Sequence, residues 1–247
     1  MTRYTADIDD EFFADLDGLC AFLKCSKSDL LGVMMSESGV SSSAKNPTSS
    51  ATGLIQFMAN NRGQYYGMTR DEFAGLRPSK QLTFVRAYMT PHIGKLTSDA
   101  ALYLAVFMPA LIGRADDSHN VVAAKEGPYG WAFNANKYFD FNNDNAIQVG
   151  ELSRSIKRQC VGPRWSEIAS RAGLKEVATG PTQFDLSTIL GVQQALADLG
   201  FNPGPQDGML GPRTISAVKV FQAANRLKVD GMPGVETAAA LRYFLKT

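Results

Sequence analysis

A short internal repeat near the C-terminal end of the chain narrows the fold of that region. The segment Asp207–Thr214 (DGMLGPRT) is echoed by Asp230–Thr237 (DGMPGVET), and each copy combines turn glycines with a helix start. Apolar residues then recur at the spacing of one helix face. The sequence predicts helices at 188–199, 212–225 and 234–245, with the apolar stripes Val192/Leu196/Leu199, Ile215/Val218/Phe221 and Ala238/Leu241/Phe244.

The same region resembles the peptidoglycan-binding domain type 1, a three-helix module. The resemblance rests on the repeated Asp-Gly turns and on 192–196 (VQQAL), 199–201 (LGF) and 217–222 (AVKVFQ), and it covers nearly all of 187–245. A generic three-helix bundle, the alternative, would not require the repeated turn. The resemblance implies that this segment binds peptidoglycan glycan strands, with ligand contacts near the first turn at Asp207, Gly208 and Arg213.

The rest of the chain has the pattern of a mainly α domain. A stretch with Gly-Pro at its centre, 175–186, predicts a linker, so we expect one domain at 1–174 and a second at 187–247. No alternating run is long enough to predict a substantial sheet. The helices predicted in the first domain are 10–24, 27–37, 70–76, 79–95, 98–112, 149–160 and 164–172.

Glu37 is the carboxylate that the local pattern singles out. A helix start is indicated at Ser26, which has an acid, Asp29, three residues later, and Gly39 is typical of a helix end in the left-handed conformation. Glu37 therefore falls in the last turn, beside two methionines and at the negative end of the helix dipole. Both surroundings are expected to raise its pKa, as a general acid requires. The alternative is a solvent-exposed glutamate at a helix end.

A second motif, Ala51–Phe57 (ATGLIQF), follows Glu37-Ser38-Gly39 after a polar loop. In this order and spacing, the pair resembles the first two motifs of lytic transglycosylases and goose-type lysozymes. Those enzymes cut the β-1,4 glycan strands of peptidoglycan with one protonated glutamate. The resemblance implies a lysozyme-like helical fold for the first domain, with the second motif lining the cleft that faces the catalytic Glu37. Gly53 would let a sugar approach the backbone, Gln56 would bond its N-acetyl or hydroxyl groups, and Leu54 is a further contact or core.

A third family motif, Ala-Tyr-Asn-Ala-Gly, is similar to 132–136 (AFNAN). Phe133 and Asn136 depart from the motif, while Asn134 is still able to bond a substrate amide. Tyr103 lies on an apolar stripe, so we predict a core residue whose hydroxyl reaches the cleft. Two tyrosines are candidates to replace the hydroxyl lost at position 133: Tyr129 and Tyr138.

The segment Asp140–Glu151 fits the spacing of an EF-hand calcium loop, with oxygen-bearing side chains at positions 1, 3, 5 and 12. Position 6 is Asn145 rather than glycine, and no convincing pair of helices flanks the loop. We therefore predict an Asx-rich turn that caps the helix at 149, without a bound metal, and keep calcium as the alternative. Nothing in the sequence calls for a cofactor.

Composition excludes several classes of protein. A formal net charge of +1 gives little support to a nucleic-acid role, and no stretch approaches the roughly 20 apolar residues of a membrane span. The N-terminal residues are acidic and polar, without the apolar core of a signal peptide. The three cysteines, Cys20, Cys25 and Cys160, leave an odd thiol and have no metal-type spacing. Cys20 and Cys25 fall in an apolar helical segment and are expected to be reduced core residues, with a disulfide as the alternative. We expect a monomer that does not insert into membranes.

No second carboxylate has a motif around it, which favours a single-glutamate mechanism. In the resembling transglycosylases, the glutamate protonates the leaving oxygen and then takes the proton of the sugar's C6 hydroxyl, closing a 1,6-anhydro ring. The prediction is an enzyme of the bacteriophage endolysin kind, made in the host cytoplasm and acting on the wall in the periplasm. The alternatives are a hydrolytic muramidase, a tail-associated lysin or secreted effector, and a non-catalytic wall-binding protein. The carboxylates considered as partners are Asp71, Glu72, Asp99, Asp140 and Asp144.

Overall fold

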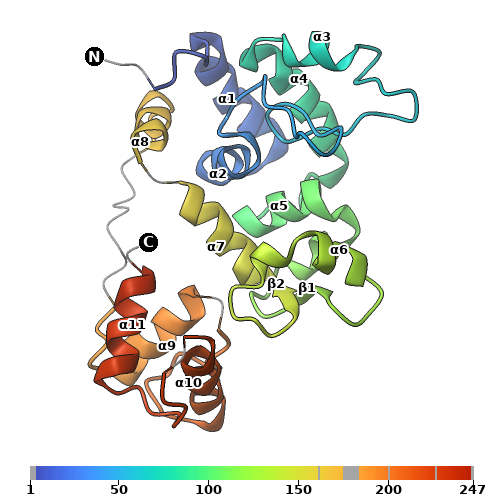
Figure 1. Ribbon diagram of the computed structural model, residues 1–247. Coiled ribbons are helices and arrows are strands. Elements are labelled where there is room, and N and C mark those ends of the chain that lie inside the picture. Colours follow the sequence, from blue (N-terminus) through green and yellow to red (C-terminus); the bar gives the residue numbers. More distant parts are fainter. Residues whose placement is uncertain (1–3, 161, 175–183, 200, 226, 246–247) are drawn as a thin grey trace. The chain divides into compact units, whose positions relative to one another are not determined.

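The computed structural model describes residues 4–160, 162–174, 184–199, 201–225 and 227–245. The described chain is mainly α, as predicted (Figure 1). Its residues group into two compact units, one drawn from Met1–Ala115 and Ile156–Val177 and the other from Asp116–Ser155 and Ala178–Thr247. The predicted linker lies largely outside the described residues, and the predicted domain boundaries stay a prediction.

The first unit is built from helices. Within it, α1 packs against α4 and α2 packs against α5. Proline interrupts two predicted helices: α4 gives way to a 3-10 turn that contains Pro91, and α5 ends just before Pro109, because proline has no N–H to continue the ladder. The elements are α1 (Asp10–Leu23), α2 (Lys27–Ser38), α3 (Arg70–Ala74), α4 (Pro78–Met89), η1 (Thr90–His92), α5 (Asp99–Phe107), η2 (Pro109–Arg114) and α8 (Gly162–Arg171).

Side-chain caps place the starts of these helices where the sequence predicted them. The Ser26 side chain accepts a hydrogen bond from the N–H of Asp29 at the start of α2. Thr69 and Glu72 form a reciprocal capping box at the start of α3, so two backbone donors are satisfied there. α3 is nevertheless shorter than the predicted 70–76, because Gly75 follows its last residue, Ala74.

Two arginines of α8 hold the N-terminal segment, although it is far away in the sequence. Arg164 pairs with Asp7, with Nη2 2.8 Å from Oδ2. Arg171 donates to the carbonyl oxygens of Thr5 and Ile8, each at 3.0 Å. These partners all precede α1, so the two arginines connect α8 to the segment that leads into the first helix.

The second unit contains a small antiparallel pair of strands, β1 (Val121–Ala124) and β2 (Ala146–Gln148). Val121 faces Gln148 and Ala124 faces Ala146, with an irregularity between Val121 and Ala123. The pair is too short to contradict the prediction that no substantial sheet forms. Between the strands lie α6 (Gly130–Ala135) and η3 (Lys137–Phe139), and α7 (Val149–Gln159) follows β2. The second unit includes α7 only as far as Ser155.

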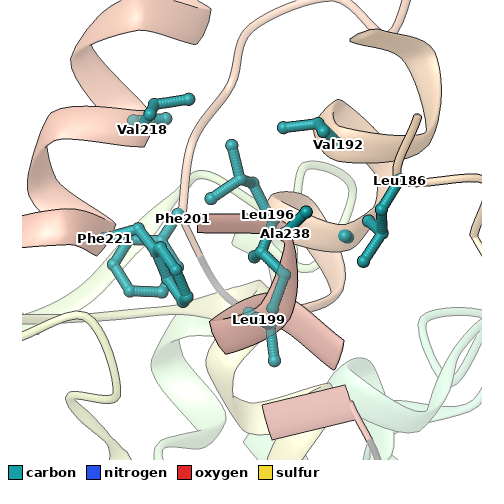
Figure 2. Close-up of a cluster of buried hydrophobic side chains, with 11 residues drawn as sticks. Leu186, Val192, Leu196, Leu199, Phe201, Val218, Phe221 and Ala238 are labelled. Atoms are coloured by element: carbon teal, nitrogen blue, oxygen red, sulfur yellow. The ribbon is translucent and has the colours of Figure 1, made fainter. Parts of the chain in front are cut away.

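Three helices near the C-terminus enclose a hydrophobic core of their own (Figure 2). They are α9 (Ile189–Asp198), α10 (Pro212–Ala224) and α11 (Val235–Leu245), close to the predicted positions. Phe201 and Phe221 meet edge to face with ring centroids 5.3 Å apart. The predicted stripes supply most of this core, although the side chain of Phe244 lies outside the described part. The buried residues are Leu186, Val192, Ala195, Leu196, Leu199, Phe201, Ala217, Val218, Phe221, Ala238 and Leu241.

Among the described residues, no helix is long and apolar enough to cross a membrane. In the same described residues, no group of three histidine, cysteine, aspartate or glutamate side chains is placed to hold a metal ion.

Candidate functional site

Glu37 lies in the last turn of α2, as the sequence predicted. The helix ends at Gly39, whose φ of 66° is the left-handed conformation expected there. The next residue, Val40, also has a positive φ, of 58°, although it is β-branched and buried. The N–H groups of Gly39 and Val40 bond the carbonyls of Met35 and Met34, so the chain reverses directly after the glutamate.

Burial governs the acidity of Glu37. It raises the pKa of the carboxyl from 4.5 to about 7, and a hydrogen bond with the Tyr103 side chain opposes part of this rise. Tyr103 belongs to α5 and is almost fully buried. Tyr88, on α4, is close enough for the charge of Glu37 to raise its pKa, together with burial. Tyr103 therefore bonds the carboxyl through its side chain, and Tyr88 lies within range of the carboxylate's charge.

The second motif forms a tight turn that contacts the end of α2. Thr52 and Phe57 exchange backbone hydrogen bonds of 3.0 and 2.9 Å, and the turn between them uses the left-handed conformation at Gly53 and Gln56. The Ser38 hydroxyl donates to the carbonyl of Leu54 at 2.9 Å. This bond joins the two motifs that the sequence predicted to lie together.

A buried glutamine that the sequence did not single out holds this turn from the other side. Gln81, on α4, is fully buried and accepts from the N–H of Leu54 at 3.0 Å. Its amide nitrogen donates to the carbonyls of Ser42 and Phe73 at 2.9 and 2.8 Å. Its only sequence signal would have been a glutamine on the inward face of an amphipathic helix.

Gln81 also changes the interpretation of Gly53. The sequence suggested that the glycine leaves room for a sugar, but a Cβ atom at this position would lie 2.4 Å from Oε1 of Gln81. Gly53 is buried, with a φ of 80°, so internal packing and the turn conformation both explain the glycine.

The other residues predicted in this motif occupy different environments. The side chain of Leu54 is fully buried, which makes it part of the core. Gln56 is partly exposed, and its amide donates to the carbonyl of Gly53 at 3.1 Å. Of these predicted contacts, Gln56 is the side chain that lines a cavity.

This cavity measures about 400 Å³ and lies in the first unit. Its wall includes Tyr88, which is also the tyrosine whose pKa responds to the charge of Glu37. The lining combines aromatic and aliphatic residues with a few residues that carry side-chain amides, a composition common in ligand pockets. The amide-bearing and tyrosine residues of the lining are Gln56, Asn60, Gln64, Tyr65, Tyr66 and Tyr88.

An arginine fixes the polar loop between the two motifs. Arg70, the first residue of α3, donates to the carbonyls of Asn46 and Ala51 at 2.8 and 2.9 Å and to the Thr52 hydroxyl at 2.8 Å. Two carboxylates considered as catalytic partners also have structural roles nearby. Asp71 pairs with Lys45 at 2.5 Å, and Glu72 closes the capping box of α3.

The third predicted motif lies in the second unit. Asn134 is exposed on α6, whereas Phe133 is buried in the interior. Asn136, which departs from the family pattern, donates its side-chain amide to the carbonyl of Ala132 at 2.9 Å. The hydroxyl of Tyr138 in turn bonds Asn136 Oδ1 at 3.2 Å. Contact between Asn134 and a substrate remains a prediction.

The loop at 140–151 is folded around a buried carboxylate. Glu151 is fully buried, and it accepts the N–H groups of Phe141, Asn142 and Gln148 at 2.8, 3.3 and 2.9 Å. Burial raises the pKa of its carboxyl to about 8. Asp140 accepts two further N–H groups of the loop, and Asn145 adopts the left-handed conformation. These bonds are the pattern of an Asx-rich turn that leads into α7.

The repeated turns of the C-terminal helices share one internal design. Gln193 is almost fully buried; its amide nitrogen donates to Asp207 Oδ1 and Thr214 Oγ1, and its oxygen accepts the N–H of Gly208 at 2.8 Å. Arg213 is exposed. Contact between Asp207, Gly208 or Arg213 and the wall remains a prediction.

The second turn repeats these contacts with Gln222. Its amide nitrogen donates to Asp230 Oδ1 and Thr237 Oγ1, each at 3.0 Å, and its oxygen accepts the N–H of Gly231 at 2.9 Å. The repeat seen in the sequence is therefore a repeat of buried glutamine contacts, with each glutamine supplied by the preceding helix.

Comparison with known proteins identifies the C-terminal module. Residues 187–241 match the family model described as a putative peptidoglycan binding domain. The chain is also 43% identical, over 61 residues, to the N-acetylmuramoyl-L-alanine amidase CwlL of Bacillus licheniformis. That match covers 22% of this chain and 17% of the amidase, so the chain spans only a small part of that relative. No solved structure matches the chain.

The chain therefore carries a peptidoglycan-binding domain, as the repeat predicted. The match runs from residue 187 to residue 241. It therefore covers the three C-terminal helices as far as residue 241 and does not include the unit that contains Glu37.

Proposed function

We propose that the chain is a peptidoglycan-cleaving enzyme in which Glu37 serves first as general acid and then as general base. The observation that carries the proposal is a partly buried carboxyl with a pKa of about 7, in contact with the Tyr103 side chain. Such a group is about half protonated at neutral pH and can donate to a glycosidic oxygen. The bond from Ser38 to Leu54 supports a fixed geometry between the glutamate and the neighbouring turn.

The proposed reaction is that of a lytic transglycosylase on the β-1,4 bond between N-acetylmuramic acid and N-acetylglucosamine. Glu37 gives its proton to the leaving oxygen as the bond from that oxygen to C1 breaks. The resulting carboxylate accepts the proton of the C6 hydroxyl, whose oxygen bonds C1 and closes a 1,6-anhydro ring. The glutamate ends in its starting protonation state, and no water is consumed.

The peptidoglycan-binding domain supports the choice of substrate. A module that stays on the polymer raises the effective concentration of glycan at the catalytic unit. A bacteriolytic role, such as that of a phage endolysin, is the setting that we propose for this pairing of a cutting unit and a wall-binding module.

The test is mass spectrometry of the fragments that the full-length protein and Glu37→Gln release from purified peptidoglycan. Products that end in 1,6-anhydro-N-acetylmuramic acid, and that are absent with Glu37→Gln, are expected. Reducing ends would instead indicate hydrolysis by a muramidase. Binding without any fragments from either protein would favour a non-catalytic wall-binding protein.

A further inference from the structure

Tyr66 occupies a backbone conformation that ill suits its side chain. Tyr65 and Met68 exchange two backbone hydrogen bonds of 2.9 Å, so Tyr66 and Gly67 are the central residues of a two-residue turn. Both have positive φ, 52° and 88°, which is the pattern of a type I′ turn. Asparagine followed by glycine is favoured there, whereas a bulky residue with positive φ is strained.

The ring of Tyr66 nevertheless stays half in solvent. Its exposed fraction is 51%, and one side of it packs on Phe84, with the ring centroids 4.6 Å apart. Phe57 and Phe73 lie behind it at 6.1 and 6.3 Å. Strained backbone conformations occur often at ligand-binding sites. Tyr66 combines such a conformation with a ring that packs on neighbouring aromatic rings and is still half exposed.

The open cavity that Tyr66 lines also holds polar groups. Gln56, Asn60 and Gln64 line the same cavity, and Tyr88, another lining residue, is within range of the charge of Glu37. The oxygen of the Asn60 side chain accepts the N–H groups of Arg62 and Gln64, and the Gln56 amide nitrogen donates to the carbonyl of Gly53. A volume of about 400 Å³ lies within the range of about 300–1,000 Å³ usual for ligand pockets. A flat aromatic ring beside amides suits a ligand with an apolar ring face and an acetamido group.

We propose that Tyr66 is a stacking platform for an N-acetylhexosamine residue of the glycan strand, bound in this cavity beside Glu37. The ring face of the sugar lies on Tyr66, and the amide side chains bond its acetamido and hydroxyl groups. This assignment rests on the proposed function, because it takes the cavity as an extension of the site at Glu37.

The experiment measures the binding of chitotetraose, a linear N-acetylglucosamine tetramer, to the full-length Glu37→Gln protein by calorimetry. In this background, Tyr66→Asn is expected to raise the Kd about tenfold, because the stacking surface is lost. Tyr66→Phe keeps the ring and is expected to stay within about twofold of the parent. Tyr4→Asn is the matched control, since Tyr4 is 50% exposed and its structural contacts are made by its backbone.

Thermal unfolding separates loss of binding from loss of fold. Tyr66→Asn places the preferred Asn-Gly pair in the turn, so its melting temperature is expected to equal or exceed that of the parent. With the fold intact, unchanged binding by Tyr66→Asn would overturn the assignment, as would a parent that does not bind chitotetraose at all.

The outcome for the proposed function is separate. If the protein with Glu37 intact releases no fragments from peptidoglycan, but binding of chitotetraose depends on Tyr66, the cleavage proposal fails and the sugar site stands. If fragments are released and Tyr66→Asn leaves both KM and binding unchanged, the proposed cleavage activity is supported and the role of Tyr66 as a stacking platform is wrong.

Discussion

The hydroxyl of Ser38 shares its one hydrogen between the carbonyl oxygens of Leu54, at 2.9 Å, and Met34, at 3.1 Å. It accepts the N–H of Ser41 at 3.1 Å as well. One side chain thus connects the last turn of α2, the loop that follows it and the turn of the second motif. Because Glu37 is the residue before Ser38, these bonds also fix the backbone that carries Glu37.

Ser38→Ala is expected to lower the free energy of unfolding by about 1–2 kcal/mol, because bonds to partly buried backbone groups are lost. Cleavage should fall further than stability explains, since the turn would no longer be held beside Glu37. Urea unfolding and fragment release measure the two effects. Ser36→Ala on the same helix is the control, and equal effects of the two substitutions would contradict the role given to Ser38.

The rate of cleavage is expected to fall as the pH rises through about 7, because the proton that Glu37 donates is then lost. Initial rates on soluble glycan fragments between pH 5 and 9 measure this limb. A rate that stays level up to pH 9 would argue against Glu37 as the acid.

The raised pKa of Glu37 also affects stability. Between its unfolded value near 4.5 and about 7, the folded state binds more protons than the unfolded state, so this group's contribution to stability falls as the pH rises. Glutamine does not titrate, so Glu37→Gln removes the fall in stability that this carboxyl causes as the pH rises. It is therefore expected to be more stable than the parent at pH 8 and similar at pH 4, as chemical unfolding would measure. The pKa of Glu151 is also raised, but Glu151 is present in both proteins, so it does not affect the difference in stability between them.

Tyr103→Phe is expected to move the basic limb of the pH–rate profile to higher pH. The hydrogen bond from Tyr103 favours the charged carboxylate and lowers the pKa of Glu37, so its removal lets burial act alone. The maximal rate should fall at the same time, because the carboxyl loses an orienting partner. Tyr4→Phe is the control. A Tyr103→Phe protein with a lower maximal rate but an unshifted basic limb would contradict the predicted effect on the pKa of Glu37.

Deletion of 176–247 is expected to weaken binding to purified walls while cleavage of soluble glycan fragments is retained. The deleted part contains the whole match to the peptidoglycan-binding domain. Co-sedimentation with purified walls measures the binding. Equal pelleting of the full-length and truncated proteins would show that the wall contact lies elsewhere.

Cys20 and Cys25 are expected to form a disulfide when the protein is treated with oxidised glutathione. Lys24 ends α1 in the left-handed conformation, and the N–H of Cys25 bonds the carbonyl of Cys20 at 3.1 Å, a helix end that brings these two side chains together. A hydrogen bond from the Cys20 thiol lowers the pKa of Cys25, which favours attack by its thiolate.

In this reaction each thiol loses a proton and an electron, and oxidised glutathione is reduced to two thiols. The intact protein should become two hydrogen atoms lighter and keep one free thiol, at Cys160. Cys25→Ser should show no such loss, and three free thiols after oxidation of the parent would contradict the prediction.

Short-range signals predicted much of what the structure contains. The Ser26 cap and the Gly39 helix end each depend on a few adjacent residues, and the structure confirms both. The C-terminal repeat predicted three helices and a binding module, because a repeated turn and an apolar stripe are visible without tertiary contacts.

The pairing of Glu37 with Tyr103, by contrast, depends on the packing of α2 against α5, and the interpretation of Gly53 depends on Gln81 of α4. These partners are far apart in the sequence, and no local pattern says which side chains meet. From the sequence alone came the start and end of α2, the wall-binding module and the candidate glutamate, because their physical causes are local. Only the tertiary structure decided the acidity of Glu37 and the buried glutamine that holds its neighbouring turn, because burial and long-range hydrogen bonds arise when helices pack.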